Sequence, residues 1–94
     1  MYQINEQELY VIKGKKGKEY KIPKVNGLTI DEFAIMLKFN HAEDLVDKIK
    51  FSKEFLLAIA PKLEEEKIGD VEYFNIFVDY NAAKTKKQIK KVGE

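Results

Sequence analysis

The stretch VIKGKKGKEYKIPKV, residues 11–25, decides the fold class, because it sets two short β-prone runs on either side of a glycine-containing turn. The runs ELYVI and KEYKI are rich in residues that favour strands, and KGKKGK between them supplies glycine where the chain needs a positive φ. We therefore predict a β-hairpin over about residues 9–22. Alternation along the returning strand places Tyr20 and Ile22 on one face, which we expect to lie on the core.

The lysines and glycines of KGKKGK also raise the question of a phosphate-binding loop. Such a loop needs Gly-Lys-Ser/Thr leading from a strand into a helix whose N-terminus meets the anion. Here Lys18 is followed by Glu19 and then by a strand. A soluble turn, whose lysines discourage pairing with other strand edges, is the better interpretation.

Beyond the hairpin, the sequence LTIDEF predicts the start of a helix. Thr29 stands three residues before Glu32, which is the spacing of a capping box, so the helix should begin at Ile30. Asn40 is a residue that can end it. The spacing of a buried helical stripe is met by Ile30, Phe33, Met36 and Leu37.

Two further short helices are expected between residues 42 and 63. Glu43 and Asp44 suit the N-terminus of the first, and Ser52 suits the N-cap of the second. Pro61 must end or kink the second helix. Whether PKLEEEKIG continues that helix or starts a new one stays open, since proline is allowed in both cases.

The segment DVEYFNIFVDYNAAK, residues 70–84, is compatible with a helix and with a strand. Its length and its pair of alanines favour a helix, which Asp70 would cap. Such a helix has two stripes. The first comprises Val71, Phe74, Phe77, Val78 and Asn81, and the second comprises Tyr73, Ile76 and Tyr80. A helix that is apolar on two sides lies centrally in the core or forms half of an interface.

These elements predict an α+β fold, a single compact domain of mainly short helices with an N-terminal β-hairpin. The domain covers residues 1–83, with the hairpin at about 9–22 and the helices at about 30–83, and residues 84–94 form a basic, flexible tail. We expect the core to contain Tyr20, Ile22, Phe33, Leu37, Leu45, Ile49, Phe55, Ile59, Phe74 and Phe77.

The composition limits the classes of function. Of the 94 residues, 45% are hydrophobic and 35% are charged, a balance that is typical of a folded domain. Cysteine is absent, which excludes disulfides, thiolate zinc sites and a cysteine nucleophile, and we expect no cofactor. No stretch resembles a signal peptide or approaches the roughly 20 apolar residues that span a bilayer. We therefore expect a cytoplasmic protein without a membrane partner.

Charge is distributed unevenly between the domain and the tail. All 17 basic residues are lysine, and five of them lie in residues 84–94, which leaves a mildly acidic domain. Arginine, whose planar fork recognises phosphate and guanine, is missing. This pattern argues against a nucleic-acid-binding face. Binding of nucleic acid through the lysine tail is kept as an alternative, which salt would weaken steeply.

No residues form a recognisable catalytic or metal-binding constellation. His41 lies near Glu43 and Asp44, but one histidine without cysteine or a second histidine is a poor metal site. The acids at residues 64–66 are adjacent in sequence, so on a helix they point in different directions and suit a solvated face. We expect no enzymatic activity.

Several segments together resemble a known family: the hairpin with YKIPKV, the helix start LTIDEF, the central FLLAIAPKL and the aromatic YFNIFVDYN. They resemble the small tail assembly chaperones of long-tailed, siphovirus-like bacteriophages and prophages, over about residues 9–83. The resemblance implies a protein that binds the helical tape measure protein during tail morphogenesis and helps bring tail tube subunits to it. It also implies that the protein is absent from the finished virion.

The surface that would bind such a partner is a hypothesis drawn from the aromatic residues. A domain of this size has limited interior, and aromatics rimmed by lysine and glutamate suit a protein-binding groove or a homo-oligomer contact. Scattered exposed apolar residues are also ordinary and need no such role. The candidate residues are Tyr73, Ile76, Tyr80, Phe39 and Phe51. A small structural virion protein or head-tail joining protein is an alternative with a similar sequence.

Overall fold

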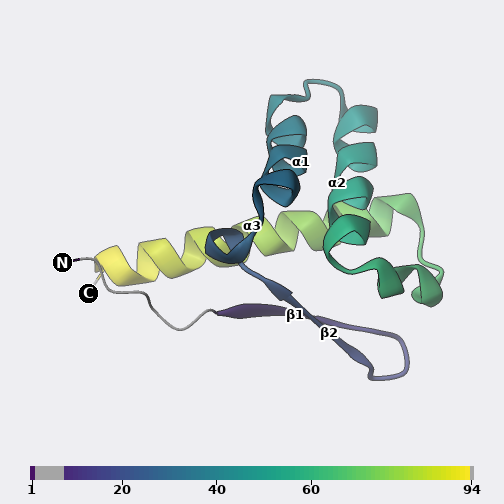
Figure 1. Ribbon diagram of the computed structural model, residues 1–94, viewed down its shortest axis with the longest axis horizontal. Helices are drawn as coiled ribbons and strands as arrows, with labels where there is room; N and C mark the ends of the chain where they lie inside the picture. Colours follow the sequence, from purple (N-terminus) through teal and green to yellow (C-terminus); the bar gives the residue numbers. More distant parts are fainter. Residues whose placement is uncertain (2–7, 94) are drawn as a thin grey trace.

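The computed structural model describes the backbone of Met1 and residues 8–93, and the side chains of Met1 and residues 8–82. Within these residues the chain forms a two-stranded hairpin followed by three α-helices and shorter 3-10 turns (Figure 1). The fold is α+β, as the sequence predicts. The last helix crosses between the hairpin and an upright pair of helices, so it is contacted from both sides.

The hairpin consists of β1 (Leu9–Lys13) and β2 (Glu19–Pro23), which pair antiparallel. Gly17 provides the positive φ that the turn requires. Both residues predicted to face the core, Tyr20 and Ile22, are buried, and this prediction is confirmed. The register is Leu9–Pro23, Tyr10–Ile22, Val11–Lys21, Ile12–Tyr20 and Lys13–Glu19.

The first helix, α1 (Ile30–His41), begins where the capping box predicts. The Glu32 backbone N–H donates to the Thr29 hydroxyl at 3.2 Å, and the Thr29 backbone N–H donates to the Glu32 carboxylate at 2.9 Å. Two of the N–H groups at the start of the helix are thereby satisfied by local residues. The helix ends one residue beyond Asn40.

The two helices expected between residues 42 and 63 are one helix, α2 (Leu45–Ile59), so that prediction is wrong. Asp44 caps it by accepting a first-turn backbone N–H at 3.2 Å. Ser52 lies inside the helix and is fully buried, and its hydroxyl donates to the Lys48 carbonyl at 2.7 Å. Because this bond satisfies the serine within the helix, Ser52 does not start a new one.

Pro61 starts a new turn, the 3-10 helix η2 (Pro61–Glu66), and α2 ends before it. The last helix is α3 (Asp70–Gly93), so the preference for a helix over a strand is confirmed. Asp70 is its first residue, not its cap, and the Asp70 carboxylate pairs with Lys53 Nζ at 2.9 Å. That ion pair attaches the start of α3 to α2.

The predicted basic tail, residues 84–94, lies outside the residues whose side chains the structure describes. Its backbone belongs to α3 as far as Gly93. Flexibility of the tail therefore stays a prediction.

The core lies where α3 meets α2 and the hairpin. Phe55 and Phe77 are fully buried, and their rings meet edge to face with centroids 5.1 Å apart. Of the predicted core residues, four are buried: Tyr20, Ile22, Phe55 and Phe77. The core also contains Met36, which the sequence placed on the buried stripe of the first helix. Six further core residues lie outside the predicted core set: Ile12, Leu56, Ala60, Leu63, Tyr73 and Tyr80.

Three predicted core residues face solvent instead, and these predictions are wrong: Phe33, Leu37 and Leu45. Three more are only half-buried: Ile49, Ile59 and Phe74. The reason on α1 is that the helix meets the core with its other side, which carries Met36 and Phe39. Leu45 is the first residue of α2, at the free end of the α1–α2 pair (Figure 1).

Candidate protein-binding surface

The predicted binding stripe of α3 is largely interior. Tyr73 and Tyr80 are each 2% exposed. The Tyr80 hydroxyl donates to the Pro23 carbonyl at 2.8 Å, and burial raises the pKa of Tyr80 to about 12. Burial also raises the pKa of Tyr73. The placement of these two tyrosines on the surface is therefore wrong, while a role in partner binding stays a prediction.

The other three candidate residues are half-buried and belong to three different helices. Phe39 on α1 packs against Phe77, with ring centroids 4.4 Å apart. Ile76 on α3 lines a groove beside β1, and Phe51 lies on α2. With two candidates buried and three half-buried, the five do not form one exposed surface.

The outer side of α1 carries several exposed apolar side chains. Ile30, Phe33 and Leu37 are 83%, 39% and 37% exposed, and Ala34 is exposed as well. We call these four residues, Ile30, Phe33, Ala34 and Leu37, the α1 stripe. The helical period gathers them on one side of α1. Three residues on the opposite side pack on the core: Ile35, Met36 and Phe39.

Sequence reasoning assigned large residues of the α1 stripe to the core and so missed this surface. A signal was present, since residues 30–41 carry apolar residues on two sides, as residues 71–81 do. Leu45 and Val46, at the start of α2, are exposed as well. Asp31 and Lys38 lie beside the stripe, and Lys38 Nζ is 3.5 Å from the carboxylate of Glu54 on α2.

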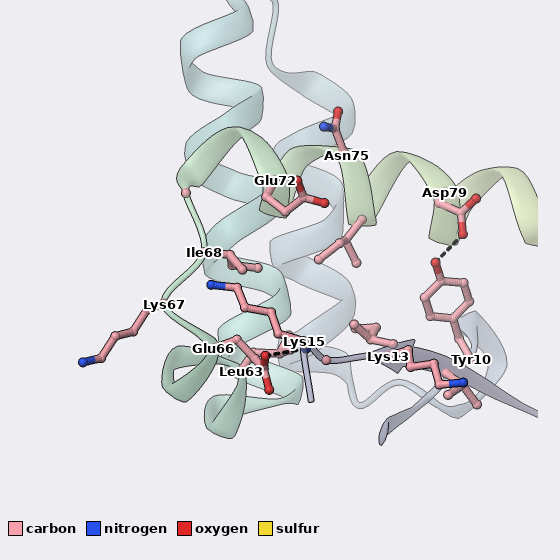
Figure 2. Close-up of a pocket in the computed structure, with 15 residues that line it drawn as sticks. Tyr10, Lys13, Lys15, Leu63, Glu66, Lys67, Ile68, Glu72, Asn75 and Asp79 are labelled. Carbon is pink, nitrogen blue, oxygen red and sulfur yellow. Dashed lines mark hydrogen bonds between the residues drawn. The ribbon is translucent and has the colours of Figure 1, made fainter. Parts of the chain in front are cut away.

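A second surface feature is a groove of about 670 Å³ between β1 and α3, shown in Figure 2. Lys13 lines it from the strand, and Glu72 and Asp79 line it from the helix. The Tyr10 hydroxyl donates to the Asp79 carboxylate at one end (Figure 2). Because lysines and acids both line its walls, the groove favours no one class of charged ligand.

Glu66 attaches η2 to the hairpin at the other end of this groove. Its carboxylate accepts the Lys15 backbone N–H at 2.9 Å and the Tyr20 hydroxyl at 2.6 Å. The bond from Tyr20, followed by the bond from Lys15, holds the pKa of Glu66 below its usual range, and the same carboxylate raises the pKa of Tyr20 to about 12. A Cβ at Gly14 would collide with the carboxylate. Glu66 is thus a half-buried residue with a structural role.

The chemistry-bearing residues weighed in the sequence are not gathered into a site within the described part of the chain. His41 is exposed at the end of α1. Among the residues that the structure describes, no three His, Cys, Asp or Glu side chains are arranged to hold a metal ion. In that same part, none of the helices has the length and apolarity that crossing a bilayer requires.

Comparisons with protein-family models, with curated proteins and with solved structures found no match. A proposal of function therefore rests on the geometry of the chain's own residues and on the resemblance that its sequence bears to the tail assembly chaperones.

Proposed function

We propose that this chain is a protein-binding module without catalysis, acting as a tail assembly chaperone of long-tailed phages or prophages. Its partners are the helical tape measure protein, which it holds during tail morphogenesis, and the tail tube subunits that it helps bring to that protein. It acts in the cytoplasm of the bacterial host. The observation that carries the proposal is the α1 stripe, an apolar helix face turned to solvent.

An exposed helix face of this kind suits an amphipathic helix as its partner. Apolar side chains at helical spacing on one helix pack against the same spacing on another. Burying exposed apolar area contributes about 25 cal/mol per Å², and no covalent chemistry is needed. α1 has 12 residues, so at 1.5 Å per residue it offers a contact only about 18 Å long. One short contact gives weak binding, which suits a chaperone that is later displaced.

Lack of sequence selectivity also suits this role. Phe33 and Leu37 present only hydrocarbon to solvent, so they impose no requirement for a particular polar group on the partner. A long helical protein offers many apolar stretches of similar spacing. Several copies of this chain can therefore bind along it at successive positions.

The test is a co-expression pull-down with the tape measure protein encoded by the same genome, at low and at high salt, each with and without nuclease. Wild type should capture the helical protein, and Phe33→Asp should lose most of that capture, because a charge would have to be desolvated at the contact. Val78→Asp is the matched control. Val78 on α3 is 44% exposed, close to the 39% of Phe33, and lies outside the stripe.

The outcomes separate the claims. No capture by the folded wild-type protein would refute the chaperone function. Equal capture by wild type and a folded Phe33→Asp protein would leave the proposed function standing but would show that the α1 stripe is not the binding surface. Material captured only without nuclease and lost at high salt would favour nucleic-acid binding by the lysine tail. Presence of the chain in purified particles would favour a structural virion protein.

A further inference from the structure

We infer that the α1 stripe also docks against the α1 stripe of a second copy, with the two helices antiparallel, and that the resulting dimer covers this face until a helical partner displaces it. The displacement step rests on the proposed function. The dimer itself does not, because it is argued only from the residues of α1.

The sizes of the side chains are complementary in this arrangement. When two α1 helices pack antiparallel about a two-fold axis, Ile30 of one copy lies opposite Leu37 of the other. Phe33 then lies opposite Ala34 of the second copy, and the reverse contact is generated by the symmetry. A large ring meets a small residue at both central positions, which lets the helices approach closely. These four residues are exposed in the single chain and so are available for the contact.

The charges beside the stripe are complementary in the same arrangement. Asp31 and Lys38 are separated by two helical turns and lie on the same flank of the stripe. Antiparallel packing brings Asp31 of each copy next to Lys38 of the other, giving two ion pairs. Parallel packing about a two-fold axis would instead place this flank against the opposite flank of the other copy, so that Asp31 and Lys38 would not pair with each other. The side chain of Lys38 is 54% exposed even with Glu54 at 3.5 Å, so it can reach a second carboxylate.

The extent of the contact makes the dimer a weak one. Two helices in contact over about 18 Å bury less than the 1,200–2,000 Å² or so that stable interfaces bury. Self-association should therefore depend on protein concentration. A weak dimer can protect an apolar face from non-specific contacts and still give way to a partner that binds many copies along its length.

The test is sedimentation velocity of the full chain over about 1 to 1,000 µM, the range in which weak interfaces saturate. Wild type should shift from monomer to dimer as the concentration rises. Asp31→Lys should weaken self-association about tenfold, because two attractive pairs become repulsive, and Lys38→Asp should do the same. Val78→Lys adds a charge on α3 outside the stripe and should leave self-association unchanged.

Mixing the two charge variants tests the antiparallel register. The Asp31→Lys chain has lysine at both positions and the Lys38→Asp chain has aspartate at both, so the mixture should form a heterodimer with wild-type affinity. A loss of folding in either variant could not produce that recovery. A wild-type chain that stays monomeric throughout would overturn the dimer. Mixed variants that do not associate would overturn the antiparallel register.

Adding the tape measure protein then tests displacement. The dimer signal should fall as the helical protein is titrated in. Captured helical protein without any self-association would reject the dimer and leave the proposed function standing. A dimer whose chain captures no helical protein would reject the proposed function and leave the dimer standing.

Discussion

α1 and α3 each carry two apolar stripes, but they expose them differently. α1 exposes Ile30, Phe33 and Leu37 on one side, whereas α3 exposes Val71 and Val78 and buries its large rings Tyr73, Phe77 and Tyr80. On α3 the two stripes are adjacent, so that Tyr73, Phe77 and Tyr80 form one broad buried face. On α1 the stripes lie on opposite sides of the helix, with Phe39 packed against the core and Ile30 facing out. Adjacent stripes can be covered together, whereas opposite stripes need a packed layer on each side. The angle between stripes, more than their number, decides which helix offers a surface.

The layers of the fold explain the difference. α3 has the hairpin on one side, where the centroids of the Tyr80 and Tyr10 rings are 5.3 Å apart. It has α1 and α2 on the other side, where Phe77 packs against Phe39 (Figure 1). Within the part of the chain that the structure describes, α1 is packed from its inner side alone. Its outer stripe has the composition of a core face in a position where the described chain provides no second layer.

The largest expected effect contrasts the two helices directly. Phe77→Ala should lower the free energy of unfolding by about 3–5 kcal/mol, because it removes a fully buried ring and leaves a cavity. Phe33→Ala should change it by less than about 1 kcal/mol, as surface substitutions do. Urea denaturation followed by circular dichroism measures both.

If Phe77→Ala does not fold, Phe77→Leu can be compared with Phe33→Ala instead. Phe77→Leu should lower the free energy of unfolding by about 1.5 kcal/mol. Equal losses at Phe33 and Phe77 would mean that the outer side of α1 is buried, and the distinction between the two helices would fail.

A smaller effect should come from the bond between α3 and the hairpin. Tyr80→Phe removes the hydroxyl that donates to the Pro23 carbonyl. It should lower the free energy of unfolding by about 1 kcal/mol, which is the net contribution of an intramolecular hydrogen bond of this kind. Urea midpoints of the variant and the wild type give the value. An unchanged midpoint would show that the hairpin does not hold α3 through this contact.

The smallest effect is a pH dependence at the hairpin. The pKa of Glu66 is lower in the folded chain than in the unfolded chain, so its contribution is present at neutral pH. The contribution should be lost as the pH falls from about 4.3, the ordinary glutamate value, through the lowered pKa. Glu66→Gln should therefore reduce the difference between urea midpoints measured at pH 7 and pH 3. An unchanged difference would show that the carboxylate is not held in these bonds.

Features specified by neighbouring residues were the ones that the sequence predicted. The Thr29–Glu32 capping box, the turn at Gly17 and the inward position of Ile22 each depend on a few adjacent residues, and all three are found. The bonds of Glu66 join it to residues 46 and 51 positions away, so no local pattern could predict them. Ser52 was misplaced for a different reason: serine suits both a helix cap and a helix interior, so its identity alone could not show that α2 continues through it.

The candidate surface was missed for a related reason. Ile30 and Phe39 occupy opposite sides of one helix, and nothing in residues 30–41 states which side meets the rest of the chain. The choice depends on where α3 lies, which is a tertiary property. Tyr73 and Tyr80 were misplaced by the same uncertainty, since an aromatic stripe next to a core stripe can belong to either a core or an interface.

The most direct measurement is methyl NMR of an Ile-, Leu- and Val-labelled chain, titrated with the tape measure protein at fixed chain concentration. The methyl signals of Ile30 and Leu37, which are exposed, should shift or broaden, while those of the buried Ile22 and Leu63 and of Val78 stay in place. That result would identify the outer side of α1 as the binding surface. Changes confined to Val78 or to Ile76, with Ile30 and Leu37 unaffected, would contradict it.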